Sequence, residues 1–89
     1  MNLRILIADD HTLMRHGARA FLQSHRGWKV VGEAANADDA VATVAQTRPD
    51  VLLLDIVMPG RSGIEAIPDL IAASPETRIL VLSMQDDPS

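Results

Sequence analysis

The chain has 89 residues, and its eight Lys and Arg side chains against twelve Asp and Glu give a formal net charge of −4 with neutral histidines. This charge and the scattering of the basic residues argue against direct nucleic acid binding, while 47% hydrophobic and 22% charged residues indicate one folded domain rather than a disordered tail. The absence of cysteine from the sequence excludes disulfides, thiolate metal sites and thiol nucleophiles.

The first two predicted elements are a strand and a helix. Residues 3–8 form a continuous apolar run with isoleucines, which is typical of a strand buried on both faces. Residues 12–24 repeat apolar side chains at helical spacing, which predicts an amphipathic helix with its apolar face toward the sheet. Gly17 lies on this inner face, and we expect it to permit close approach of the helix to the sheet.

The middle of the chain predicts a second strand, a second helix and a third strand. Residues 28–34 contain adjacent valines and predict the strand, and Asn36 is suited to cap the helix that follows. We expect this helix to end before Arg48 and Pro49. Residues 51–55 are the most apolar stretch of the chain and predict the third strand, which could extend to residue 57.

A third helix and a fourth strand complete the pattern. Apolar residues between positions 64 and 71 recur at helical spacing, although Pro68 removes a backbone donor there and costs about 3 kcal/mol unless the helix kinks. Residues 78–84 are again apolar and predict a strand. The alternation of strands and helices predicts an α/β fold with a doubly wound parallel sheet and helices on both faces.

Polar side chains that could form a site follow three of the predicted strands. Asp9 and Asp10 follow the first strand and Asp55 ends the third, so three carboxylates meet at one sheet edge if these strands are neighbours. Because the carboxylates repel one another, either one of them takes up a proton or a cation lies between them; a divalent cation is the natural solution, and oxygen ligands near a phosphate suit Mg²⁺. One such carboxylate can attack a phosphoryl group, and Ser83, after the fourth strand, offers a hydroxyl to a phosphoryl oxygen.

Each acid also has a simpler explanation. Asp9 and Asp10 could be a helix cap with a solvated neighbour, and Asp55 could cap a turn. Acids and a hydroxyl placed after three strands of one sheet are a much rarer combination, which favours a site.

Three segments around these residues resemble the receiver domain of bacterial two-component response regulators, most of all the NarL/FixJ (LuxR-type) subfamily. The segments are RILIADDHTLMRHG (4–17), RPDVLLLDIVMPGRSGIEAI (48–67) and TRILVLSMQDD (77–87). The resemblance covers nearly the whole chain. It implies the flavodoxin-like, or CheY-like, receiver fold with strand order 2-1-3-4.

The resemblance also implies a role for each candidate site residue. Asp55 is the phosphoacceptor, Asp10 is a direct Mg²⁺ ligand and Asp9 acts largely through water. The backbone carbonyl of Val57 completes the protein's metal ligands, and Ser83 is the switch hydroxyl that moves toward the phosphoryl group. Mg²⁺ is the implied cofactor, with Mn²⁺ as an alternative.

The implied function is phosphoacceptor signalling. A sensor histidine kinase donates the phosphoryl group, and the receiver controls a DNA-binding transcriptional output domain. Such a domain catalyses only its own phosphorylation and slow dephosphorylation, so it is only partly an enzyme. We expect a cytoplasmic location, because the apolar runs of the sequence are too short for a membrane span or a signal peptide.

Receivers of this family are longer than this chain. The resemblance therefore implies that residues 1–89 are one receiver domain without the fifth strand, the last helices, the lysine that pairs with the phosphoryl group, or an output domain. The fourth strand would then be an open edge. We expect either a longer protein or a homodimer, domain-swapped dimer or strand addition through that edge.

Two other functions compete with this one. A magnesium-dependent aspartyl phosphohydrolase usually needs a second acid two residues after its nucleophile, and Val57 occupies that position here. A non-phosphorylated protein-interaction domain would retain the acids as a vestige and bind a partner through its apolar faces.

The remaining polar residues have simpler expected roles. His11, His16 and His25 are expected to be solvated or to cap helices. Arg15 and Arg19 lie one helical turn apart and form either a kinase-docking face or an ordinary solvated face.

Overall fold

The computed structural model describes residues 2–82, and within this range strands and helices alternate as predicted. The strands are β1 (Leu3–Ala8), β2 (Trp28–Ala34), β3 (Val51–Asp55) and β4 (Arg78–Leu82). The helices are α1 (Thr12–Gln23), α2 (Ala37–Thr47) and α3 (Gly63–Ala73). β3 ends at Asp55, so its extension to residue 57 is wrong, and predicted strand residues 83 and 84 lie outside the described residues.

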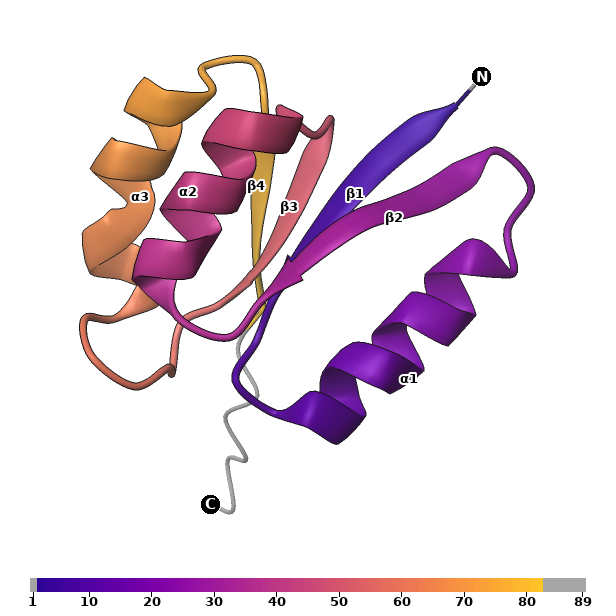
Figure 1. The fold of residues 1–89 in the computed structure, drawn as a ribbon, viewed down its shortest axis with the longest axis horizontal. Helices are drawn as coiled ribbons and strands as arrows, with labels where there is room; N and C mark the ends of the chain where they lie inside the picture. Colours follow the sequence, from indigo (N-terminus) through magenta and orange to yellow (C-terminus); the bar gives the residue numbers. More distant parts are fainter. Residues whose placement is uncertain (1, 83–89) are drawn as a thin grey trace, which may run out of the picture.

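The strands form one parallel sheet in the order β2-β1-β3-β4, which confirms the predicted topology. Helices α2 and α3 cover one face of the sheet and α1 lies on the other (Figure 1). β1 and β3 are direct neighbours, with Ala8 opposite Leu54 at the end of their pairing. This arrangement brings the carboxyl ends of the first and third strands together.

The main core lies between the sheet and the helices α2 and α3. Leu6, Leu52 and Leu54 are completely buried there against apolar residues of both helices. Because side chains alternate along a strand, Ile5 and Ile7 point to the opposite face, where α1 packs. The remaining members of the core cluster are Ala8, Ala34, Ala37, Ala40, Val44, Met58, Ala66 and Leu70.

Helix α1 is much less buried than its sequence pattern predicts. Leu13 is 84% exposed and Phe21 is 64% exposed, and none of the twelve residues of α1 is buried. A helix is about 10 Å wide and covers roughly two strands at about 4.8 Å spacing, so one helix leaves its flanks open on a wider sheet. The close approach expected at Gly17 is wrong, since an added Cβ there meets no described atom within 4 Å.

Helices α2 and α3 begin with side-chain caps. The side chain of Asn36 accepts a hydrogen bond of 2.8 Å from the backbone N–H of Asp39, as its position predicted. Ser62 and Glu65 form a reciprocal capping box at the start of α3, which the sequence analysis missed. Pro68 lies on the exposed side of α3, which continues through it as one helix to Ala73.

Candidate functional site

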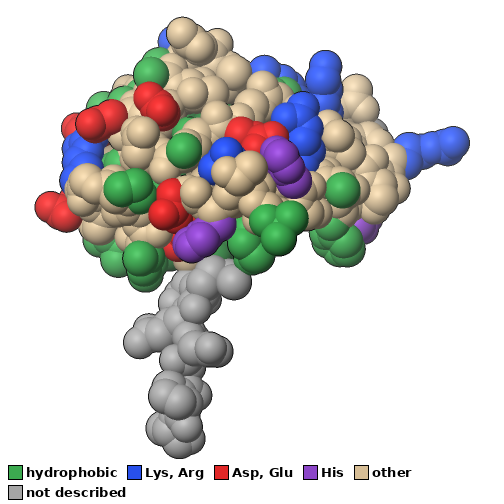
Figure 2. Space-filling view, turned by 60° about the horizontal axis from the view of Figure 1, so that its bottom comes forward, with side chains coloured by type: hydrophobic (Ala, Val, Ile, Leu, Met, Phe, Trp, Pro, Cys, Tyr) green, Lys and Arg blue, Asp and Glu red, His purple; other side chains and the backbone are tan. Residues whose placement is uncertain are grey.

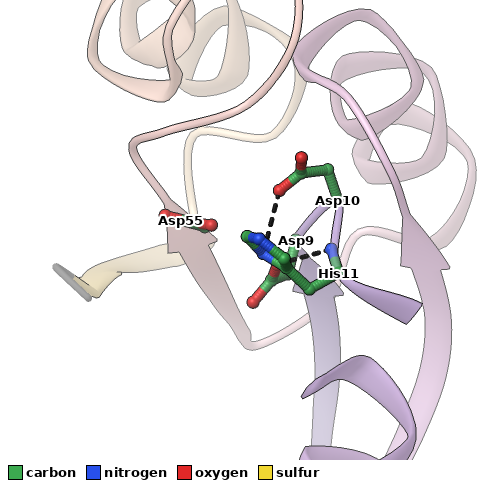
Figure 3. A group of neighbouring side chains, drawn as sticks. All are labelled: Asp9, Asp10, His11 and Asp55. Atoms are coloured by element: carbon green, nitrogen blue, oxygen red, sulfur yellow. Dashed lines mark hydrogen bonds and ion pairs between the residues drawn. The ribbon is translucent and has the colours of Figure 1, made fainter. Parts of the chain in front are cut away.

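Four side chains converge at the carboxyl ends of β1 and β3. Each of Asp9, Asp10, His11 and Asp55 offers one ligand atom, and these atoms all lie within 4.8 Å of one another. Asp55 comes from β3, while the other three residues follow β1 and face it across the sheet edge (Figure 3). The three carboxylates therefore meet where the strand order predicted.

The Asp55 carboxylate is the most deeply buried group of the cluster. Its residue is 2% exposed, and its Oδ1 accepts a hydrogen bond of 3.0 Å from the backbone N–H of Val57. Its Oδ2 is buried without a hydrogen-bond partner among residues 2–82, and so is Oδ1 of Asp10. Such orphaned carboxylate oxygens are costly unless something electropositive lies beside them.

His11 is the member of the cluster that sequence analysis missed. Its ring Nδ1 lies 3.0 Å from Asp9 Oδ1 and 3.1 Å from Asp10 Oδ1. The hydrogen bond to Asp9, followed by the nearby charge of Asp10, raises the pKa of His11 above its ordinary value. The sequence did show that His11 directly follows the acid pair. The orientation of its ring, however, depends on the backbone conformation at the start of α1, which the sequence pattern does not give.

The acids do not cap the helix. The residue at the N-cap of α1 is His11, whose side chain makes no capping hydrogen bond within the described part of the chain. Asp9 Oδ1 instead accepts the backbone N–H of His11 at 2.9 Å. The cap explanation for Asp9 and Asp10 is therefore wrong, and both carboxylates remain free to face Asp55.

The cluster fits a hard divalent cation. Three carboxylates supply oxygen ligands, and two of their buried oxygens accept no hydrogen bond in the described structure. Val57 is 70% exposed, and its backbone carbonyl is a predicted ligand. Ser83 lies outside the described residues, so its predicted place beside the cluster is not tested.

Arg15 supports the loop that carries the acids. Its guanidinium donates a hydrogen bond of 2.7 Å to the backbone carbonyl of Asp9 and pairs with Glu33 of β2 at 3.1 Å. Arg19 pairs with the other oxygen of Glu33 at 2.7 Å. The Arg15 side chain is 15% exposed, so an ordinary solvated face does not describe it.

The charge of Glu33 makes its pairing with Arg15 and Arg19 depend on pH. Hydrogen bonding to Arg19, and then to Arg15, lowers the pKa of Glu33 below its ordinary value. The charged form thus stabilises the fold above the pKa of the unfolded chain, and that contribution is lost as the pH falls toward the lower folded pKa. We expect Glu33→Gln to reduce the free energy of unfolding by about 1 kcal/mol at pH 7, with the difference from wild type shrinking below about pH 4.

Urea unfolding at pH 7 and at acid pH checks this expectation. Glu76→Gln, at an exposed position in the turn before β4, is the matched control and should change little at either pH. An equal loss for Glu33→Gln at both pH values would contradict the charge-based explanation.

The loop after β3 is fastened by a second charged group. Arg61 pairs with Asp38 of α2 at 3.1 Å and with Asp69 of α3 at 2.6 Å. The loop between Asp55 and α3 is thus tied to both helices that cover its face of the sheet.

The edge of the sheet that carries the site comes forward in Figure 2. Acidic and histidine side chains lie next to one another there, with hydrophobic side chains nearby.

Comparison with known proteins gives one consistent family. The family model described as the response regulator receiver domain matches residues 5–89. The transcriptional regulatory protein YxjL of Bacillus subtilis is 42% identical over 84 residues, which are 94% of this chain and 38% of that protein. The chain therefore spans well under half the length of this relative.

Solved structures agree with the sequence match. A LuxR-family two-component response regulator from Aurantimonas sp. SI85-9A1 superposes with a TM-score of 0.90 and 35% identity, over 97% of this chain and 61% of that one. The signal receiver domain of the putative response regulator NarL from Mycobacterium tuberculosis superposes with a TM-score of 0.87 and 34% identity, over 98% of this chain and 70% of that one.

Among the described residues, no helix has the length and apolar character needed to cross a membrane.

Proposed function

The chain belongs to the response regulator receiver domain family, and from this premise we propose that Asp55 is its phosphoacceptor. The observation that supports the assignment is the burial of Asp55, which is 2% exposed, whose carboxylate belongs to the cluster with the acid pair, and whose Oδ2 has no hydrogen-bond partner among residues 2–82. The donor is a sensor histidine kinase, and the response passes to a DNA-binding transcriptional output domain.

In the proposed reaction, a carboxylate oxygen of Asp55 attacks the phosphorus of a phosphohistidine. A P–O bond forms as the P–N bond breaks, and the departing imidazole keeps the electron pair and takes up a proton. Asp9, Asp10, Asp55 and the Val57 carbonyl would hold Mg²⁺ or Mn²⁺. When bound, this ion neutralises charge on the transferring phosphoryl oxygens.

The chain's own groups account for the choice of nucleophile. The Val57 N–H holds Oδ1 of Asp55 at 3.0 Å and leaves Oδ2 as the oxygen without a partner in residues 2–82. Arg15 fixes the backbone of Asp9 and thereby the start of the acid pair. Ser83, as the switch hydroxyl, would carry the change at Asp55 into the segment that follows β4.

The competing functions have less support. A phosphohydrolase would need an acid at position 57 to protonate its leaving group, and valine stands there. A vestigial interaction domain would not need buried carboxylate oxygens such as those of Asp10 and Asp55, which have no hydrogen-bond partner in the described part of the chain and destabilise a fold that does not use them.

Mass spectrometry after incubation with Mg²⁺ and acetyl phosphate tests the proposal. We expect an adduct of about 80 Da, one phosphoryl group, that is absent from Asp55→Asn and absent when the metal is chelated. Glu76→Gln, in the exposed turn before β4, is the control and should be labelled like the wild type. Labelling of Asp55→Asn, or no labelling of the wild type, would rule out Asp55 as the acceptor.

Self-association and location are further parts of the proposal. Leu80, Val81 and Leu82 of β4 are each about half exposed, which supports a homodimer or domain-swapped dimer through this strand. A molecular mass by light scattering equal to that of one chain would argue against self-association.

The proposed cytoplasmic location rests on the sequence features and on the family.

A further inference from the structure

His11 occupies a position at the site that the proposed roles of the three acids do not use. Its ring stands between the carboxylates of Asp9 and Asp10, with Asp55 across the sheet edge (Figure 3). Asp55 is 2% exposed, its carboxylate belongs to the same cluster, and its Oδ2 has no hydrogen-bond partner among the described residues. The imidazole is therefore part of the ligand cluster and not a neighbour of it.

The distances around His11 match those within a metal coordination sphere. Two ligand atoms at right angles around an ion with bonds of ~2.1 Å are ~3.0 Å apart. The Nδ1 atom lies 3.0 Å from Asp9 Oδ1 and 3.1 Å from Asp10 Oδ1. The four side chains of the cluster each offer one ligand atom, and these atoms lie within 4.8 Å of one another, which is close enough for them to share one ion.

A hydrogen bond alone satisfies the arrangement less well. The Nδ1 atom can carry one proton, and its hydrogen bond goes to Asp9 Oδ1 at 3.0 Å. Asp10 Oδ1, although 3.1 Å from the same nitrogen, stays buried without a hydrogen-bond partner in the described structure. A cation serves both carboxylates and the ring nitrogen together.

We propose that His11 Nδ1 is a direct ligand of the divalent ion at this site, which makes the ligand set mixed nitrogen and oxygen. The inference rests on the proposed function, because it concerns the same ion. Oxygen ligands alone suit Mg²⁺, whereas an imidazole ligand strengthens the binding of first-row transition ions. The site is thus selective for a borderline ion such as Co²⁺ over Mg²⁺ to an extent set by His11.

Pulsed electron paramagnetic resonance of the Mn²⁺-loaded chain tests the ligand directly. We expect nitrogen coupling from a directly bound imidazole in the wild type and none in His11→Asn or His11→Ala. His16→Ala is the matched control, since His16 is exposed on the same helix outside the cluster, and it should keep the coupling. Circular dichroism checks that the variants are folded, which the 60% exposure of the His11 side chain favours.

Calorimetric titration with Co²⁺ and with Mg²⁺ provides the second readout. Loss of partners outside the ligand shell costs about 10–100-fold in metal affinity, so we expect His11→Asn to weaken Co²⁺ binding by at least about tenfold. The same variant should change Mg²⁺ binding by less than about threefold, because asparagine still offers an oxygen. The ratio of the two affinities is the quantity that a purely structural role of His11 would not move.

The outcomes separate this inference from the proposed function. If Mg²⁺ and Mn²⁺ bind but the wild type shows no nitrogen coupling, His11 is not a ligand while the phosphoacceptor proposal stands. If neither ion binds, the metal site and the role of His11 are both wrong. Coupling that is lost only in the His11 variants, together with a selective loss of Co²⁺ affinity, supports the inference.

Discussion

Replacing Gly63 with alanine is expected to lower the free energy of unfolding by about 2–3 kcal/mol and to reduce phosphoryl uptake at Asp55. A Cβ at position 63 would lie 2.6 Å from the backbone oxygen of Asp55 and 3.1 Å from Cα of Ile56. Both neighbours are backbone atoms, which cannot rotate away. The end of β3 must therefore shift, and the Asp55 carboxylate shifts with it.

Urea unfolding and the acetyl phosphate assay measure the two effects of Gly63→Ala. Gly17→Ala is the matched control, because a Cβ there meets no described atom within 4 Å. Alanine inside helix α1 should raise the free energy of unfolding by about 0.5–1 kcal/mol and leave phosphoryl uptake unchanged. A Gly63→Ala protein as stable and as readily labelled as the wild type would show that α3 can move away from β3 at little cost.

The second large effect is expected for Leu52→Ala, at about 3–5 kcal/mol of lost stability. Leu52 is completely buried in β3, in the core between the sheet and the helices α2 and α3. Truncation removes apolar contacts and leaves a cavity that neighbouring strands cannot fill. Small domains have only about 5–15 kcal/mol of stability, so this variant should be partly or largely unfolded at 37 °C.

Leu13→Ala provides the comparison for the same chemical change at a surface position. Leu13 is 84% exposed on α1, so its truncation should alter the free energy of unfolding by no more than about 0.5 kcal/mol. The midpoints of urea unfolding give both values. Equal losses for Leu52→Ala and Leu13→Ala would mean that α1 is buried in solution and that its exposed face belongs to an interface.

The sequence predicted the elements of the fold well because their signals are local. The continuous apolar run of residues 51–55 and the cap at Asn36 depend only on neighbouring positions, and the structure confirms both. The strand order came from the resemblance, since periodicity does not say which strands pair. The burial of α1 was predicted incorrectly, because the exposure of Phe21 depends on how many helices share its face of the sheet.

The candidate site was predictable in part. Asp9, Asp10 and Asp55 could be placed together because the carboxyl ends of neighbouring parallel strands share an edge. The pairing of Arg15 with Glu33, 18 positions apart, required the packing of α1 on β2 and left no local signal. The contact between Gly63 and the backbone of Asp55 likewise exists only once α3 has folded back on β3.

The uniform direction of the four strands gives the molecule two ends with different tolerance to chemical change. The described candidate site residues lie at or just past the carboxyl ends of β1 and β3, whereas the connection between α1 and β2 lies at the opposite end of the sheet (Figure 1). Because the chain has no cysteine of its own, a fluorescent dye or surface linker can be attached to the thiol introduced by Arg26→Cys, at an exposed position in that connection, and the length of the strands would keep it away from the acids. Immobilised or labelled protein prepared in this way would retain an unobstructed site for kinase-transfer and metal-titration measurements.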